Sequence, residues 1–423
     1  MNKQQGKIPQ IRFPEFKELW EHKKFGDIFS FRITNSFSRD KLNYRNGDVK
    51  NIHYGDIHSK FSTLFDITKE YVPFINPEIE LKRIDDGNYC QVGDLVITDA
   101  SEDYEGIGKS VEIINLNNER LLAGLHTILA RPEKSIVGLG FFGYYFKNEN
   151  FRHNLKIIAQ GSKVLSISSS RIAEVVISIP PSISEQTRIA SFFTVVDKKI
   201  AELKQKKALL EQYKKGVMQK LFSQELRFRD ENGKEFPEWE KKKLGELGEF
   251  VGGGTPTTKD NSFWNGDIPW LSSSDLAEDS IYKLFPTRFI TKEAISKSAT
   301  KLIPPKSILI ISRVGVGKVA INDVGVCTSQ DFTNLIPKKD NHLFLAYLIK
   351  QQTEKLLAFN QGTSIKGFVK SDLADIRILL PSIKEQDKIA NFLSAIDEKI
   401  NRTETQIQQT QEWKKGLLQK MFC

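Results

Sequence analysis

Two segments of the chain, residues 181–222 and 381–422, are copies of one another. They align without a gap at an offset of 200 residues, and about 17 of the 42 aligned positions are identical. The identities gather at the two ends of the segments. Chance rarely produces self-similarity of this extent, so we conclude that the chain is an internal duplication and that its fold is organised twice over.

Each copy has the pattern of a long helix. A proline and then a capping box, Ser182 with Glu185 and Ser382 with Glu385, predict where the helices begin. From there apolar or long-stemmed residues recur at alternating spacings of four and three, which is typical of a heptad seam. The seam residues of the first copy are Ile189, Phe193, Val196, Ile200, Leu203, Lys207, Leu210, Lys214, Val217 and Leu221. Those of the second copy are Ile389, Leu393, Ile396, Ile400, Thr403, Ile407, Thr410, Lys414, Leu417 and Met421. A lone helix would expose this stripe to water, so we expect the two helices to pack on each other.

A shorter repeat precedes each globular stretch and fixes the order of the parts. It reads FPEFKELWEHKKFGDIF from Phe13 and FPEWEKKKLGELGEF from Phe236. Only a short segment separates the first long helix from Trp239, which is too little chain for a return connection between parallel helices. We therefore expect antiparallel helices and a pseudo-twofold repeat.

The expected fold is α+β, with two globular mixed α/β domains separated by two long antiparallel coiled-coil helices. The expected parts are a first domain at 1–180, a first spacer helix at 181–223, a second domain at 224–380 and a second spacer helix at 381–423. A helix of ~40 residues would be ~60 Å long at 1.5 Å per residue.

Composition narrows the class of partner. Hydrophobic residues make up 39% and charged residues 27% of the 423 positions, as in a folded soluble protein. The formal net charge of +9 favours a polyanion as partner, although a merely basic surface would give the same value. Three cysteines, Cys90, Cys327 and Cys423, are too few and too scattered for a disulfide framework or a metal site, which fits a reducing cytoplasm. No apolar run reaches the ~20 residues of a spanning helix, so we expect no membrane partner.

The sequence does not contain the motifs that catalysis on DNA or binding of ATP would require. The Asn-Pro-Pro-aromatic segment of an adenine methyltransferase and the G-x-G-x-x-G turn are both missing. The stretches EGIGKS, at 105–110, and RVGVGKVA, at 313–320, do not match the Walker pattern of ATP-binding proteins. The six histidines lack metal-ligand spacing, and His126 is expected to be a buried core residue. The sequence therefore predicts no catalytic residue, no metal site and no cofactor in this chain.

The same two Gly-x-Gly-Lys stretches have two interpretations. Each follows an apolar run, so each could be the glycine turn of a β-hairpin. Each could also present a cation to a nucleic-acid phosphate, with Lys109, Arg313 and Lys318 as candidates. The sequence alone leaves both open. GSKVLSISSSRIAEV and GTSIKGFVKSDLADI, another matched pair, are either loops facing DNA or loops that close their domains.

Base reading would use polar side chains on domain loops, since these can address groove edges. Candidates in the first domain are Tyr54, His58, Lys60, Ser101, Lys109 and Lys163. Candidates in the second are Thr255, Thr257, Lys259, Ser272, Ser273, Ser274, Arg313, Lys318, Gln330 and Lys366. Many of these positions would equally suit ordinary turns. The first helix also carries eight Lys against two Glu between 198 and 220, which could be a solvated face, a track for DNA backbone or a dock for acidic partners.

The chain resembles the specificity subunits of type I restriction-modification systems over essentially its whole length. KKGVMQKLFSQELRFRDENGKEFPEWEKKKLGEL resembles that family's central region running into a second target-recognition domain, and GGGTPTT followed by FWNGDIPWLSSSDL resembles the start of such a domain. The first domain departs from this pattern, with FSFRITNSFSRD and IHYGDIHS at the corresponding places.

The resemblance implies a function and a set of partners. It implies that each domain reads one half of a bipartite site in double-stranded DNA and that the helices set the gap between the halves. It also implies two DNA methyltransferase subunits, which bind S-adenosylmethionine, and restriction and translocase subunits, which use ATP and Mg²⁺. The competing hypothesis is a basic coiled-coil scaffold without sequence-specific reading. A self-sufficient endonuclease is disfavoured because the chain shows no acid cluster.

Overall fold

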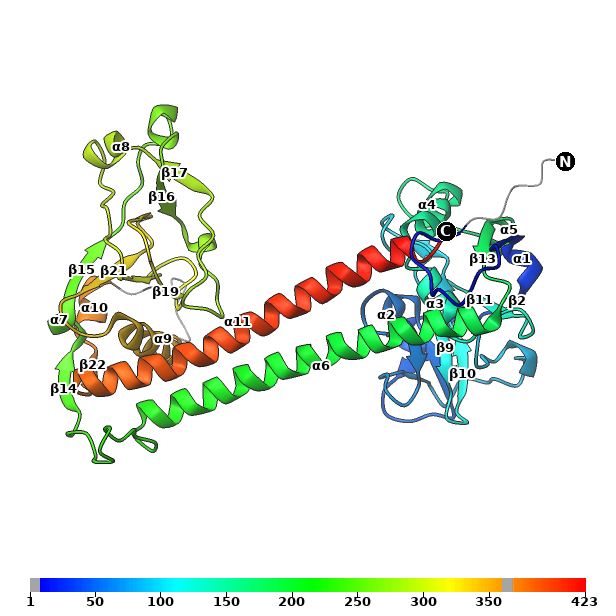
Figure 1. The fold of residues 1–423 in the computed structure, drawn as a ribbon, viewed down its shortest axis with the longest axis horizontal. Coiled ribbons are helices and arrows are strands. Elements are labelled where there is room, and N and C mark those ends of the chain that lie inside the picture. The colour runs from blue at the N-terminus through cyan, green and yellow to red at the C-terminus, as the bar shows by residue number, and fades with distance from the viewer. Residues whose placement is uncertain (1–7, 360–366, 368) are drawn as a thin grey trace. The chain divides into compact units, whose positions relative to one another are not determined.

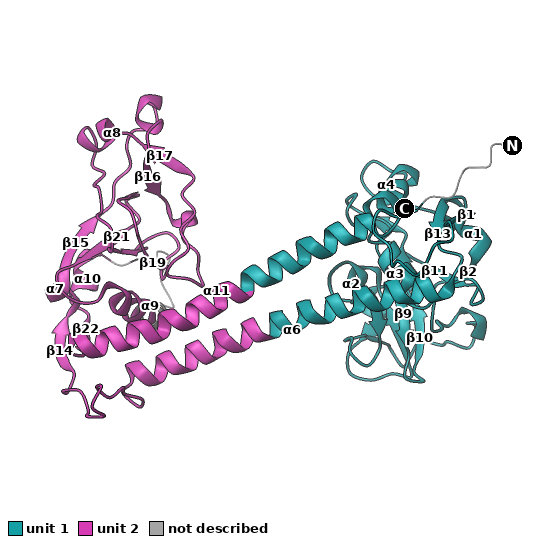
Figure 2. Ribbon diagram, in the orientation of Figure 1, with its two compact units in different colours: residues 1–205, 404–423 teal, residues 206–403 magenta. Residues whose placement is uncertain are grey.

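The computed structural model describes residues 8–359, 367 and 369–423, and it divides into two compact units (Figure 2). The first unit comprises Met1–Gln205 with Glu404–Cys423, and the second comprises Lys206–Thr403. Each unit therefore combines one globular stretch of sequence with parts of both repeated segments.

The repeated segments form two long helices, α6 at Ile183–Phe222 and α11 at Ile383–Lys420 (Figure 1). In the first unit the ring of Phe193, near the start of α6, stacks on Phe422 just beyond the end of α11, with 5.9 Å between centroids. In the second unit Lys214, near the end of α6, lies 2.6 Å from Asp397, near the start of α11. The start of one helix meets the end of the other in both units, so the predicted antiparallel packing is confirmed.

Burial along α6 and α11 follows the predicted seam. Every heptad position named from the sequence is buried or partly buried, and the neighbouring polar positions are mostly exposed. The partly buried positions are Lys207, Leu210, Lys214, Ile400, Thr410 and Lys414, so four of the six carry a lysine or a threonine. The apolar ends of the seam join the cores of the two units.

The prediction of a capping box is wrong for the glutamate in both copies. The carboxylate of Glu185 is buried and accepts hydrogen bonds from Arg12 Nε at 2.7 Å and Trp20 Nε1 at 3.2 Å. Glu385 does the same with Arg227 Nε at 3.2 Å and Trp239 Nε1 at 3.1 Å. The glutamates therefore tie each helix to the short repeat that precedes its domain.

The prediction for the serine of the capping box is confirmed in one copy only. Ser182 Oγ accepts a 3.4 Å hydrogen bond from the backbone N–H of Glu185. Ser382 Oγ is buried and has no hydrogen-bond partner among the residues that the structure describes. The glutamine after each glutamate braces a loop instead, since Gln186 accepts from Gly138 N–H at 2.7 Å and Gln386 from Asn341 N–H at 3.0 Å.

The first unit contains two larger sheets. The five-stranded sheet has the order β2-β11-β7-β9-β5 and is antiparallel except for the β9–β5 pair; its strands are β2 Phe29–Arg32, β11 Thr127–Pro132, β7 Leu95–Thr98, β9 Ser110–Asn115 and β5 Leu64–Asp66. The four-stranded sheet has the order β10-β4-β6-β3 with β10 and β4 parallel; its strands are β10 Arg120–Ala123, β4 Val49–Ile52, β6 Phe74–Ile75 and β3 Leu42–Asn43. Strands β12 Leu165–Ser166 and β8 Ala100–Ser101 form a separate antiparallel pair.

The second unit repeats this plan with fewer strands. Its main sheet is antiparallel in the order β15-β21-β18-β19, with strands β15 Gly248–Gly252, β21 Thr333–Pro337, β18 Ile308–Ile310 and β19 Val319–Ile321. Its second sheet has the order β17-β16-β20 with β16 and β20 parallel, and its strands are β17 Arg288–Ile290, β16 Ile268–Leu271 and β20 Cys327–Thr328. In both units, then, a smaller sheet with one parallel strand pair accompanies a larger sheet, which is antiparallel in the second unit and antiparallel except for the β9–β5 pair in the first.

The short sequence repeat forms the same substructure in both units. In the first unit β1 Glu21–Lys24 pairs antiparallel with β13 Val176–Ile179, and in the second β14 Glu240–Lys243 pairs antiparallel with β22 Arg377–Leu380. A one-turn helix follows the first strand of each pair and packs against a short helix before the second strand. These helices are α1 Phe25–Ile28 with α5 Ser169–Ala173, and α7 Leu244–Leu247 with α10 Lys370–Ala374.

The remaining helices cover the sheets or cap loops. They are α2 Tyr54–Ser59, α3 Phe141–Tyr145 and α4 Glu149–Ile158 in the first unit, and α8 Lys292–Ser296 and α9 His342–Phe359 in the second. Short 3₁₀ turns are η1 Arg39–Lys41, η2 Asp86–Asn88, η3 Asn261–Trp264 and η4 Ser273–Asp275. The core of the first unit is rich in phenylalanine and takes in Leu417 and Phe422 from the C-terminal end of the chain.

Candidate nucleic-acid interface

Four loops of the first unit meet at one edge of its sheets. Strands β4 and β10 are parallel and in register, with Ile52 opposite Ala123, so the loops that follow them start side by side. Thr98 at the end of β7 lies opposite Thr127 at the start of β11, which brings the turn after β7 to the same edge. The loop before β12 joins them, because Leu165 pairs with Ser101. Predicted site residues from distant parts of the sequence are thereby gathered.

Helix α2 supplies Tyr54 and His58 to this edge, and a buried carboxylate holds it in place. Asp56 accepts from Arg39 Nη1 at 2.7 Å and pairs with Lys60 Nζ at 2.8 Å. Burial alone would raise the pKa of Asp56, but the hydrogen bonds from Arg39 and Lys60 outweigh burial and lower it. The ammonium of Lys60 therefore helps to hold helix α2 in place, although the lysine side chain is half exposed.

The surroundings of His58 favour the neutral form of its imidazole. Burial lowers its pKa, and the nearby charge of Lys109 lowers it further. A neutral imidazole has one donor and one acceptor nitrogen, so it can match either kind of group on a base edge.

The turn between β7 and β9 carries Ser101 and Lys109 and connects two strands that pair antiparallel. Gly108 has a φ of +64°, and a Cβ on Gly106 would stand 2.1 Å from Ser101 Oγ. Arg152 fastens the turn by donating to the carbonyl of Ile107 at 2.6 Å. The glycine-turn interpretation is therefore confirmed, and phosphate contact by Lys109 stays a prediction.

His126 is not the buried core residue that the sequence suggested. Its side chain is 48% exposed, its φ is +56°, and its Nδ1 lies 3.5 Å from Asp99 Oδ1. Its ring meets the ring of Tyr54 edge-on at 5.3 Å between centroids. The apolar residues on either side made the position look like core, whereas the chain turns there between β10 and β11 and directs the ring outward, among the candidate residues.

The fourth loop, between α4 and β12, contains Lys163. A backbone bridge between Gln160 and Ser166 closes the loop, and Lys163 is exposed within it. The strand pairing of Leu165 with Ser101 places this cation beside the β7–β9 turn.

The second unit brings the corresponding loops together. Ser272, Ser273 and Ser274 follow β16 and form the start of η4, where Ser272 Oγ donates to the buried Asp275 at 2.7 Å. Ser273 lies beside the β18–β19 hairpin, 3.6 Å from where a Cβ of Gly315 would be. Gly315 has a φ of +85°, so this second Gly-x-Gly-Lys stretch is also a hairpin turn.

Lys318 and Arg313, both at this hairpin, differ in whether their side chains are bound within the unit. The ammonium of Lys318 donates to the carbonyls of Leu276 at 3.0 Å and Ser273 at 3.4 Å, so it braces η4. The side chain of Arg313 is exposed at the turn. Of the two, Arg313 is the better placed for an external phosphate or base.

The loop after β15 contains Thr255, Thr257 and Lys259, all exposed. Thr255 hydrogen-bonds Gln330, which stands in the β20–β21 loop as His126 stands in the β10–β11 loop. The carbonyl of Thr257 accepts from Trp264 Nε1 at 3.0 Å. Lys366 lies outside the described residues.

Sequence reasoning missed Arg39 and Arg288, which flank the candidate surface. Arg288 stacks over the ring of Trp270 at 4.3 Å and approaches Asp275 at 3.9 Å. A usable signal was present, because Asp56 in IHYGDI and Asp275 in LSSSDL occupy the same place after equivalent strands. An aspartate buried in both copies requires a cation nearby.

Two features are absent from the part of the chain that the structure describes. No three His, Cys, Asp or Glu side chains there are grouped as a metal site would require. No helix within that part combines the length and apolar character that crossing a membrane requires.

Comparisons with known proteins agree on one family. The family model described as type I restriction modification DNA specificity domain matches residues 17–212 and 237–411. The MjaIX specificity subunit of Methanocaldococcus jannaschii is 36% identical over 178 residues, which is 41% of this chain and 41% of that protein, so the matched part spans about two fifths of that relative's length. The provisionally assigned MjaX specificity subunit of the same organism is 26% identical over 96% of this chain and 93% of its own length.

A solved structure shares the fold. The S subunit of a type I restriction-modification system from M. genitalium superposes with a TM-score of 0.57 at 13% identity and covers 99% of both chains.

Proposed function

The chain belongs to the type I restriction modification DNA specificity family, and from this premise we propose that it is the sequence-reading subunit of a type I restriction-modification complex. Each unit reads one half of a bipartite site in double-stranded DNA. Methyl transfer and cleavage are carried out by other polypeptides.

The observation that carries this proposal is that the two units share their buried contacts but differ in the loops at the sheet edge. These buried contacts recur residue for residue, as with Glu185 and Glu385, each bound to an arginine and a tryptophan. The loops at the sheet edge differ, since Tyr54 stands in the first unit where Ser273 stands in the second, and His58 stands where Ala277 stands. A bipartite reader needs one frame used twice and two different reading surfaces.

The remaining parts of the proposal concern partners. Type I chemistry implies two methyltransferase subunits that bind S-adenosylmethionine, and restriction and translocase subunits that use ATP and Mg²⁺. The exposed lysines along α6 offer either a surface for acidic patches on these subunits or a track for DNA backbone.

The test is to sequence methylated adenines in a host that expresses this chain with its methyltransferase subunits. We expect methylation at one bipartite motif. Replacing residues 224–380 with those of a relative should change one half of that motif and leave the other half unaltered.

Methylation without any motif, or a motif indifferent to the replacement, would contradict sequence reading. A basic scaffold without base contacts would give that result, because phosphate contacts carry no sequence information.

A further inference from the structure

The two units have pockets at equivalent places. Beside each pocket a lysine of one long helix pairs with an aspartate of the other, and a tyrosine hydroxyl donates to that aspartate; the groups are Lys414, Asp197 and Tyr144 in the first unit, and Lys214, Asp397 and Tyr347 in the second. The pockets have volumes of about 740 Å³ and 720 Å³. Each is lined by the lysine after the paired one, Lys415 or Lys215, and by the lysine three residues after the tyrosine, Lys147 or Lys350.

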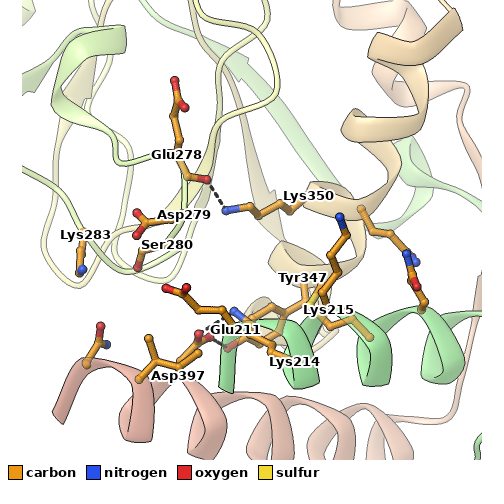
Figure 3. A pocket seen from close by; sticks show the side chains of 15 residues that line it. Glu211, Lys214, Lys215, Glu278, Asp279, Ser280, Lys283, Tyr347, Lys350 and Asp397 are labelled. Carbon is orange, nitrogen blue, oxygen red and sulfur yellow. Dashed lines mark hydrogen bonds and ion pairs between the residues drawn. The ribbon is translucent and has the colours of Figure 1, made fainter. Parts of the chain in front are cut away.

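Charges in the pocket of the second unit balance. Four lysines face four carboxylates there. Lys350 points across the pocket and donates to the carbonyl of Glu278 at 2.7 Å, and Lys214 meets Asp397 at 2.6 Å (Figure 3). This pocket supplies its own counter-charges.

The pocket of the first unit has a surplus of positive charge. Five lysine or arginine side chains line it against two carboxylates. Both carboxylates are already paired, Glu105 with Lys156 and Glu149 with Lys415. Among the described residues, neither Lys109 nor Lys147 has an ion-pair partner for its ammonium group.

The ammonium of Lys147 is held in an unfavourable place. It is partly buried, and burial together with the charges of Arg152, Lys414 and Lys109 lowers its pKa to about 8. A charge kept in such surroundings without a partner costs stability, and an entering anion would remove that cost. Groups that oppose folding in this way are typical of binding sites.

The pocket adjoins the sheet edge at which the four loops of the first unit meet. Lys109 stands at the end of the turn that carries Ser101, and Arg152, which also lines the pocket, fastens that turn through Ile107. A duplex read by the loops would therefore bring its backbone to the mouth of the pocket.

We propose that the pocket of the first unit binds a phosphate group of the DNA backbone through the ammonium groups of Lys109 and Lys147, and that the equivalent pocket of the second unit does not. The inference rests on the proposed function, since it takes DNA to be the ligand. It assigns the two units unequal shares of the backbone contacts.

The experiment measures DNA binding by the complex assembled with its methyltransferase subunits, as a function of salt. The probes are a duplex with the methylated motif and one without it, and the variants are Lys147→Gln and, as matched control, Lys350→Gln. Losing one phosphate contact should reduce the slope of log affinity against log salt by about 1 on both duplexes. We expect this for Lys147→Gln and not for Lys350→Gln.

Melting temperature gives a second readout. Lys147→Gln removes a charge that folding disfavours, so the variant should melt no lower than the parent while it binds DNA more weakly. An unchanged slope, a slope change equal in both variants, or lost binding that accompanies a lower melting temperature would each overturn the inference. If the parent complex fails to distinguish the two duplexes, the proposed function itself fails, which is a separate result.

Discussion

A single buried carboxylate near the start of each long helix holds the helix to the segment that precedes its domain. Glu385 is fully buried and accepts hydrogen bonds from both Arg227 and Trp239. Truncating it would leave a partly buried guanidinium without its carboxylate and an indole N–H without an acceptor, which should cost about 3 kcal/mol. We expect Glu385→Ala to lower the melting temperature of the chain by several degrees in a thermal unfolding experiment.

The control is Glu398→Ala on the same helix. Glu398 pairs with Arg402 one turn later, and both side chains are more than half exposed, so its loss should change stability by less than ~0.5 kcal/mol. Equal changes in stability from the two substitutions would show that the buried contact stabilises the chain no more than the exposed one.

The sequence predicted that Glu185 and Glu385 matter, but not what they bind. The capping-box pattern is local and could be recognised, whereas Arg12 lies 173 residues from Glu185 in the chain. His126 shows the opposite failure, since its apolar neighbours indicated burial while a turn exposes it. In both cases the deciding contact is tertiary and has no local signature.

The pH dependence of stability tests the environment of Lys147. Its pKa is about 8 in the folded chain against an ordinary value of 10.5. Below pH 8 the folded and unfolded states both carry the proton, so the full penalty of the buried charge is present. Between pH 8 and 10.5 the folded state loses the proton first, and stability gains.

We therefore expect Lys147→Met to be more stable than the parent at pH 7 and to lose that advantage as pH rises towards 10.5. Denaturant unfolding of both proteins at a series of pH values measures the difference. A constant difference across the range would mean that the group has its ordinary pKa.

At the scale of elements, polar contacts pin the register of the paired helices. Lys414 of α11 pairs with Asp197 of α6, and Tyr144 lies beneath the lysine with 5.3 Å from its ammonium to the ring centroid. A partly exposed pair of this kind should have a coupling energy of about 1 kcal/mol. We expect a double-mutant cycle with Lys414→Ala and Asp197→Ala to show it in thermal or denaturant unfolding.

A comparison pair lies one residue away. Lys415 and Glu149 are both exposed, so a cycle between them should show less than ~0.5 kcal/mol. Coupling of the same size in both cycles would argue against a role of the first pair in register.

The heptad spacing made α6 and α11 the best-predicted elements, because it reports burial directly at period 3.5. The short strands and the four loops of each unit could not be placed in this way. Tyr54 and His126 are 72 positions apart and meet only because β4 and β10 pair in parallel. Candidate residues could thus be chosen by type from the sequence, but their gathering depends on strand pairings that the sequence does not display.

At the scale of the whole molecule, each long helix begins in one unit and ends in the other, so the length of both helices should govern which half-sites one complex can read together. Inserting seven residues into α6 after Gln205 and seven into α11 before Glu404 keeps the heptad seam in phase. Each helix grows by ~10 Å at 1.5 Å per residue. At 3.4 Å per base pair this corresponds to ~3 base pairs of DNA. We expect the unspecific gap in the methylated motif to lengthen by that amount while both half-sites keep their bases.

Insertion into α6 alone supplies the contrast, because it shifts Asp197 and Lys214 apart while their partners on α11 stay fixed, and both Lys–Asp pairs cannot then form at once. Such a chain should lose methylation altogether. If the double insertion left the gap unchanged, the helices would have no part in setting the distance between half-sites, and the spacing would have to come from how the partner subunits hold the DNA.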